Sequence, residues 1–222
     1  MQADGQGERA SDAPEGARSH RFRRGARVLF WLWAALSLGV TSALMMGHTY
    51  ALPRPSTANR ELRAAIARDR GPEDRGRWLV HHFMYSRCRC SQRVVASLVT
   101  RGPLPSVRER VVLVGAHPEY EAALHAARFA LDVVTPERLK ARYRVEAAPL
   151  LVVSDPVGEV RYAGGYTERK QGPAVQDVAI VRALMRGQGA SELPLFGCAV
   201  SRSLQMMLDP LGLKSPSRRE DW

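Results

Sequence analysis

Residues 78–91 read WLVHHFMYSRCRCS. The apolar and aromatic residues at 78–84 predict a β-strand. The ten residues that follow at 91–100, SQRVVASLVT, place apolar side chains at helical spacing and predict a helix that Gly102-Pro103 ends. Cys88 and Cys90 therefore lie at the junction between a strand and a helix.

Strands and helices continue to alternate downstream of this junction. Asp155–Gly158 has turn chemistry and predicts a hairpin between the last two strands. We expect strands at 110–115, 131–134, 149–153 and 159–163, and helices at 118–129, 136–143 and 174–185. This order predicts an α/β fold with a small mixed sheet and helices on both faces.

The composition excludes some classes of protein. An apolar fraction of 45% over 222 residues argues against wholesale disorder. The net charge of +11 raises the question of an anionic partner. No recognisable nucleic-acid-binding module or basic helix with interleaved aromatics accompanies this charge, so we expect no nucleic acid partner.

The N-terminal region predicts a membrane anchor. We interpret residues 1–27 as a disordered cytoplasmic tail, because they show no apolar period. Residues 28–47, VLFWLWAALSLGVTSALMMG, carry no charge and are long enough for a helix to cross a hydrocarbon core of ~30 Å. Residues 48–74 contain prolines and a short amphipathic stretch at 58–67, which predicts a stalk with a lead-in helix.

Arginines crowd the chain just before the apolar segment, at 18, 21, 23, 24 and 27. This distribution predicts an N-terminus inside the cell and a C-terminal body outside the cytoplasm. We expect a single-pass protein of the inner membrane with a periplasmic or otherwise extracytoplasmic domain. A cleaved signal peptide, with small residues at Thr49 and Ala51, is the alternative.

Two motifs together resemble the thioredoxin superfamily. The first is YSRCRCS at 85–91, and the second is VEAAPLL at 145–151, followed by a strand, a turn with Gly158 and another strand. The resemblance covers residues 75–187 and implies a thioredoxin-like domain. It further implies that Pro149 is a cis-proline opposite Cys88, and that Ala148 and Pro149 hold a substrate peptide.

This chain departs from the family pattern in the spacing of its cysteines. The family has two residues between them, whereas here only one separates Cys88 from Cys90, and Ser91 takes the family's second position. Cys198 lies in the C-terminal extension at 188–222 and is the other candidate for the resolving sulfur. The helix N-terminus and the neighbouring arginines at 87 and 89 are expected to favour a thiolate at Cys88.

These features predict a thiol–disulfide oxidoreductase that acts on protein thiols or disulfides, with Cys88 attacking and Cys90 or Cys198 resolving. No cofactor is expected for that activity. One alternative is a copper-binding or copper-delivery protein, since two thiolates and a histidine from His81 or His82 suit a soft metal. The other alternative is a non-catalytic binding module, because a fold does not determine a function.

Overall fold

The chain forms two compact units in a computed structural model, one at residues 1–49 and one at residues 50–222. The structure describes residues 15–49, 51–170, 172 and 174–209. The expected tail at 1–14 and the end of the C-terminal extension at 210–222 lie outside the described residues.

The first unit is one long helix, α1 (Glu15–Thr49). Its window Gly25–Ser42 is long and apolar enough to cross a membrane, with a mean hydropathy of 1.2, and none of the window is buried within the protein. The predicted irregular tail is wrong for residues 15–27, which are helical. Alanine, arginine and glutamate are good helix formers, and a helix that has nucleated in the apolar segment extends through such residues at little cost.

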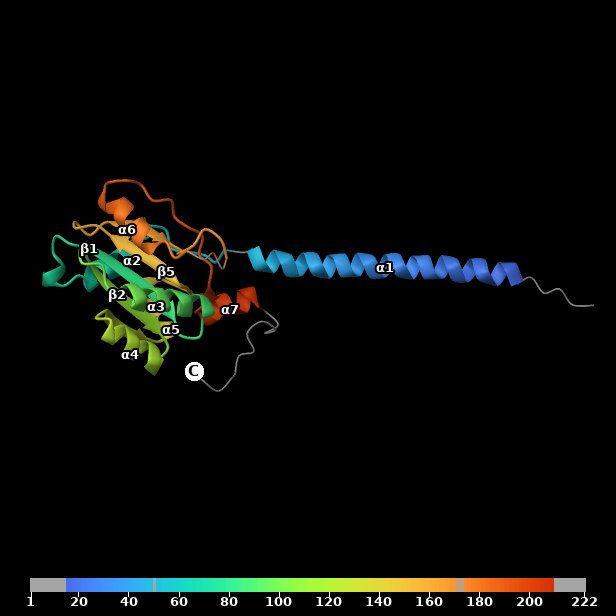
Figure 1. Ribbon diagram of the computed structural model, residues 1–222, viewed down its shortest axis with the longest axis horizontal. Coiled ribbons are helices and arrows are strands. Elements are labelled where there is room, and N and C mark those ends of the chain that lie inside the picture. The colour runs from blue at the N-terminus through green and yellow to red at the C-terminus, as the bar shows by residue number, and fades with distance from the viewer. Residues whose placement is uncertain (1–14, 50, 171, 173, 210–222) are drawn as a thin grey trace, which may run out of the picture. The chain divides into compact units, whose positions relative to one another are not determined.

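The second unit is built around a five-stranded sheet with the order β3-β2-β1-β5-β6 (Figure 1). Its central strand β1 pairs in parallel with β2, and β2 pairs in parallel with β3. On the other side β1 pairs antiparallel with β5, which forms the predicted hairpin with β6. The strands are β1 (Trp78–Tyr85), β2 (Val107–Val114), β3 (Ala130–Val134), β5 (Leu150–Ser154) and β6 (Val160–Gly164). The expected mixed sheet with an antiparallel closing hairpin is confirmed.

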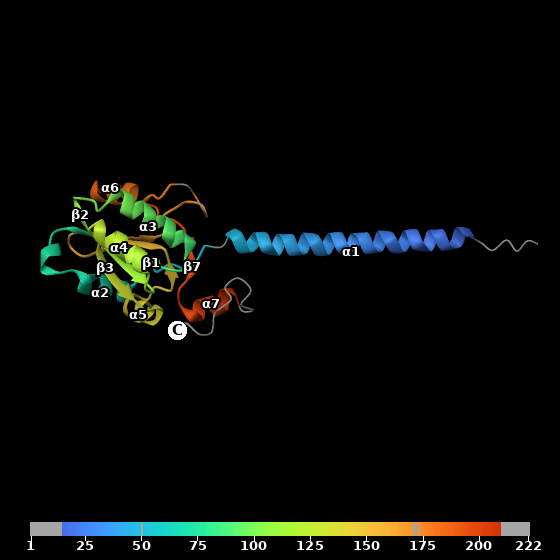
Figure 2. The ribbon, with the colours of Figure 1, turned by 60° about the horizontal axis from the view of Figure 1, so that its bottom comes forward.

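Helices cover both faces of this sheet, as Figure 2 shows. Side chains of α2 (Arg60–Asp69) and α5 (Pro136–Tyr143) pack into one hydrophobic core. Those of α3 (Arg89–Arg101), α4 (Pro118–Ala126) and α6 (Asp177–Met185) pack into the other. Two of these helices begin at a side-chain cap. The Asn59 side chain accepts a hydrogen bond from the backbone N–H of Leu62 at the start of α2, and the Thr135 side chain accepts one from the backbone N–H of Arg138 at the start of α5.

The C-terminal extension returns to the strand–helix junction. A two-stranded sheet joins β4 (Ala147–Ala148) to β7 (Cys198–Ala199) in antiparallel register, and α7 (Arg202–Leu208) follows. The backbone N–H of Leu52 also donates to the carbonyl of Leu195 at 2.8 Å. No sequence pattern predicted β4, β7 or α7, because each is too short to show a period.

A buried polar cluster ties α2 and α5 to the central strand. Asp69 of α2 accepts hydrogen bonds from the Nε2 atom of His81 at 3.1 Å and the Tyr143 hydroxyl at 2.7 Å, and it pairs with Arg142. Burial by itself would raise the pKa of Asp69, but these hydrogen bonds and the nearby positive charge outweigh it and hold the pKa at about 2. The cluster therefore contributes stability through an ionised carboxylate.

Replacing Asp69 with Asn should lower the free energy of unfolding at pH 7 by about 2 kcal/mol, because buried donors lose a charged acceptor. The folded pKa of about 2 lies below the ordinary value of 3.8. The stabilisation is therefore present above about pH 4 and is lost as the pH falls through about 2. Urea unfolding at several pH values should show the difference between wild type and D69N shrinking over this window. The exposed Glu119→Gln variant is the control, and an equal acid sensitivity of D69N and wild type would contradict the prediction.

Close backbone contact between β7 and β4 predicts a steric effect at Gly197. A Cβ atom at this position would overlap the Ala148 carbonyl oxygen and lie 2.7 Å from Cδ of Pro149. We expect Gly197→Ala to lower the free energy of unfolding by about 1–3 kcal/mol, the usual cost of overpacking. Gly189→Ala is the matched control because a Cβ there meets nothing within 4 Å. Equal urea midpoints for the two variants would contradict the close packing.

Candidate functional site

Cys88 lies in the turn between β1 and α3 and is the N-cap residue of that helix. Its backbone N–H donates to the Tyr85 carbonyl at 3.0 Å, and its own carbonyl accepts from the N–H of Gln92 at 2.9 Å. The side chain is fully buried, with 0% of its surface exposed. The sulfur thus stands at the beginning of a helix but inside the domain.

The segment around Pro149 lies directly against this sulfur. The Ala148–Pro149 peptide bond is cis, and the Sγ atom of Cys88 is 3.8 Å from the Ala148 carbonyl oxygen. Ala148 is also the register partner of Cys198 in the β4–β7 pair. The structure therefore brings together Cys88, Ala148, Pro149 and Cys198 from three distant parts of the chain.

Cys90 completes a group of three sulfurs, which we call the sulfur cluster: Cys88, Cys90 and Cys198. The Cys88 thiol is buried and interacts with both of the other cysteine side chains. Cys90 and Cys198 are half-buried and pack against the same hydrophobic core. Cys88 is therefore the middle member of the cluster, and the other two stand nearer the solvent.

The three sulfurs differ in acidity. Hydrogen bonding to Cys198 raises the pKa of Cys88, and burial adds to this effect, while the Cys90 thiol acts in the opposite direction. The contact with Cys88 lowers the pKa of Cys198, although burial opposes the shift. The contact with Cys88 and burial both raise the pKa of Cys90. Within the cluster Cys198 is therefore the thiol that loses its proton most readily.

This order differs from the sequence-based expectation that Cys88 carries the thiolate. The expectation relied on the helix N-terminus and on Arg87 and Arg89, and both of these side chains are exposed whereas Cys88 is buried. The interaction with Cys198, together with burial, therefore raises the pKa of Cys88 despite the helix N-terminus. Ser91, which takes the family's second cysteine position, is buried, and its hydroxyl accepts from the N–H of Tyr85 at 3.0 Å.

Both histidines of β1 are fully buried and are held by partners outside the sulfur cluster. His81 bonds to Asp69, and burial lowers its pKa despite that carboxylate. His82 lies on the opposite face of the strand, where its Nδ1 atom is 2.9 Å from the Tyr166 hydroxyl. Among the described residues, the ring nitrogens of these histidines bond to Asp69, Tyr166 and Glu109 and not to a cysteine. The side chains of consecutive residues in β1 point to opposite faces of the sheet, as expected. His81 and His82 therefore face the two different hydrophobic cores.

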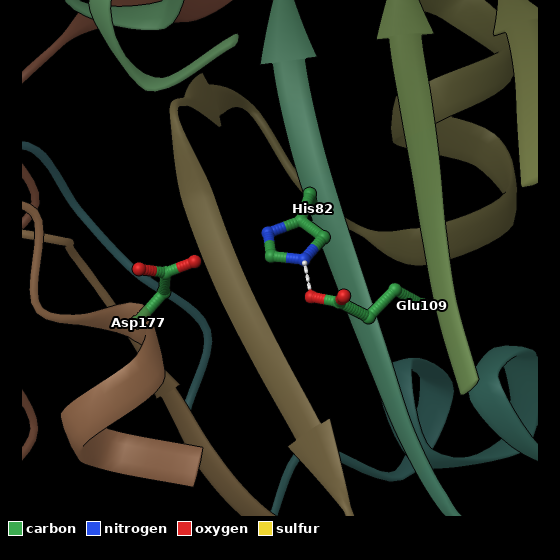
Figure 3. Close-up of side chains that lie close together, drawn as sticks. All are labelled: His82, Glu109 and Asp177. Atoms are coloured by element: carbon green, nitrogen blue, oxygen red, sulfur yellow. Dashed lines mark hydrogen bonds and ion pairs between the residues drawn. The ribbon is translucent and has the colours of Figure 1, made fainter. Parts of the chain in front are cut away.

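One group of potential metal ligands occurs in the described part of the chain: His82, Glu109 and Asp177 (Figure 3). The Nε2 atom of His82 lies 3.0 Å from Glu109. The Arg101 guanidinium bridges the two carboxylates, at 2.6 Å from Glu109 and 2.7 Å from Asp177. Burial would raise the pKa of Glu109, but hydrogen bonds from His82 and Arg101 hold it at about 2. Because a cation already occupies this position, we interpret the group as an ion-pair network that fastens α3 and α6 to the sheet.

Comparisons with known proteins give structural similarity at low sequence identity. No protein-family model matches the chain, and no curated protein is significantly similar to it. A hypothetical protein from Sinorhizobium meliloti is 17% identical with a TM-score of 0.40, and the match covers 69% of this chain and 91% of that chain.

Two further solved structures are similar at equally low identity, and one of them is named as a disulfide oxidoreductase. A secreted Mycobacterium tuberculosis disulfide oxidoreductase homologous to E. coli DsbE is 18% identical with a TM-score of 0.39, covering 51% of this chain and 84% of that one. StoA from Bacillus subtilis is 18% identical with a TM-score of 0.32, covering 40% of this chain and 73% of that chain. Solved structures similar to this chain thus include thiol–disulfide oxidoreductases.

Proposed function

We propose that this protein is a membrane-anchored thiol–disulfide oxidoreductase that acts on protein thiols or disulfides outside the cytoplasm. The observation that carries the proposal is the position of Cys88, whose sulfur lies beside the carbonyl of Ala148, the register partner of Cys198, while Cys90 packs against the same core. Such proximity is the arrangement from which a disulfide can form and be passed between sulfurs. Two of the three cysteines are half-buried rather than enclosed, so the cluster has a route to a partner.

The reaction proposed is thiolate attack on a disulfide sulfur through a mixed disulfide. Cys88 is the common sulfur, since it can pair with either neighbour, and Ala148 and Pro149 form the wall beside it. The same chemistry runs as reduction or oxidation according to the potential of the partner. No metal or cofactor takes part in this proposal.

The location proposed for the domain follows from α1. Arginines gather in the N-terminal part of α1, before its unburied apolar stretch, and this order suits an anchor whose C-terminal side is outside the cytoplasm. Disulfides form and persist there, whereas cytosolic thiols are kept reduced. Because Cys90 and Cys198 are half-buried, the sulfur cluster is accessible for disulfide exchange with other proteins in that compartment.

The redox proposal is tested by equilibrating the full chain, solubilised in mild detergent, with glutathione buffers and a copper chelator. Mass spectrometry then maps the state of each sulfur. We expect a reversible disulfide that includes Cys88, with a potential above about −300 mV. Cys88→Ser should remove it, because this cysteine alone contacts both others.

Cys90→Ser serves as the control for that experiment, since it leaves the Cys88 and Cys198 pair in place. Serine is also a good N-cap residue, so Cys88→Ser should keep the beginning of α3. A chain whose sulfurs stay reduced across the whole range of buffers would contradict the redox activity and favour copper binding or simple docking.

The anchor is tested by cell fractionation in a Gram-negative host. We expect the full-length chain to remain in the membrane pellet after an alkaline carbonate wash, because an apolar helix of this length is retained by the bilayer. Protease added to spheroplasts should degrade the domain that follows α1. A shorter, soluble product that begins after Ala51 would show a cleaved signal peptide instead.

A further inference from the structure

The sulfurs of the cluster differ in access as well as in acidity. Cys88 exposes none of its surface, whereas Cys90 and Cys198 are half-buried. A disulfide on another protein is bulky and attached to a backbone, so it cannot reach a sulfur that solvent does not reach. In this arrangement the first contact with a partner falls to one of the two outer cysteines.

The backbone around Cys198 holds its sulfur in place against Cys88. Pairing with Ala148 sets the register of Cys198, and Gly197 packs directly against the Ala148 carbonyl. On the other side the backbone N–H groups of Val200 and Ser201 donate to the Glu146 carbonyl at 2.7 and 3.2 Å. Cys198 is therefore carried on an ordered strand with anchors on both sides, and not on a loose tail.

Resting on the proposed function, we propose that Cys198 is the sulfur that exchanges with the partner protein, and that Cys88 receives the disulfide from it inside the domain. The flanking residues Gly197 and Ala199 are partly exposed, as Cys198 is, so a partner can reach this segment of the chain. The substrate class is a disulfide exposed on the surface of another protein, or the corresponding dithiol in the reverse direction.

The relay is balanced in atoms and electrons. The Cys198 thiolate attacks one sulfur of the partner disulfide, which forms a mixed disulfide and releases the first partner thiolate. The Cys88 thiolate then attacks the Sγ atom of Cys198, which forms the Cys88–Cys198 disulfide and releases the second partner thiolate. Two electrons pass from the cysteine pair to the partner, and the two protons of the original thiols go to the two partner thiols.

The charges around the cluster support this order. The interaction with the Cys88 thiol lowers the pKa of Cys198 although burial opposes the shift, and Lys170 lowers the pKa of both outer thiols. Contact with Cys88 and burial raise the pKa of Cys90, which leaves that outer sulfur the poorer nucleophile. Cys198 thus combines access, acidity and contact with Cys88.

The test uses oxidised glutathione as the probe and the full chain in detergent, with three single variants. Cys88→Ser should accumulate a glutathione adduct on Cys198, because no internal thiol remains in contact to resolve it. Cys198→Ser should slow oxidation of Cys88 by about tenfold or more, since the accessible thiolate is lost. Cys90→Ser is the same change at the other half-buried sulfur, and the relay predicts a smaller loss of rate there than in Cys198→Ser. The exposed Glu119→Gln variant lies outside the sulfur cluster and is the added control, expected to react within about twofold of wild type.

Several outcomes would overturn the relay. Oxidation of Cys198→Ser at the wild-type rate, with the adduct on Cys88, would reject it while leaving the proposed oxidoreductase intact. A loss of rate in Cys90→Ser as large as that expected for Cys198→Ser would make Cys90 the sulfur that exchanges with the partner, and would also reject the relay through Cys198. A wild-type chain that forms neither an adduct nor a disulfide would reject the proposed function too. Circular dichroism and urea midpoints for each variant show that the compared proteins are folded.

Discussion

The functional site depends on one backbone pairing, in which the short strand β7 lies antiparallel to β4. This pairing sets Cys198 opposite Ala148 and so brings a sulfur from the C-terminal extension to the beginning of α3. Its close contact at Gly197 leaves no room for a Cβ atom. Without it, the turn at Cys88 would hold two cysteines separated by a single residue, and the third sulfur would lie elsewhere.

Buried ion pairs give this site a rigid support. Asp69 fastens α2 and α5 to one face of β1 through His81 and Arg142. Glu109 and Asp177, bridged by Arg101, fasten α3 and α6 to the other face. Since α3 carries Cys88 and Cys90 at its beginning, the second network positions the sulfurs without touching them. Each buried carboxylate has charged or polar donors, as buried charge requires.

The interaction with Cys198, reinforced by burial, explains why the acidity of Cys88 differs from that expected at a helix N-terminus. The dipole and nearby cations stabilise a thiolate most where the sulfur is partly exposed. Cys88 is enclosed and its pKa is raised, whereas the interaction with Cys88 lowers the pKa of Cys198. Because Cys88 is enclosed, solvent does not reach its sulfur, whereas Cys90 and Cys198 are partly exposed to solvent.

The amino-acid sequence by itself determined the elements that have a period or a cap. Thr135 and Pro136 predicted α5 to the residue, the apolar run predicted β1, and the alternation of strands and helices predicted the mixed sheet. Only the tertiary structure decided the place of Cys198 and the partners of His81 and His82. The physical reason is that β4 and β7 are too short to show a pattern, and that a buried polar side chain takes its partner from whichever distant element packs against it.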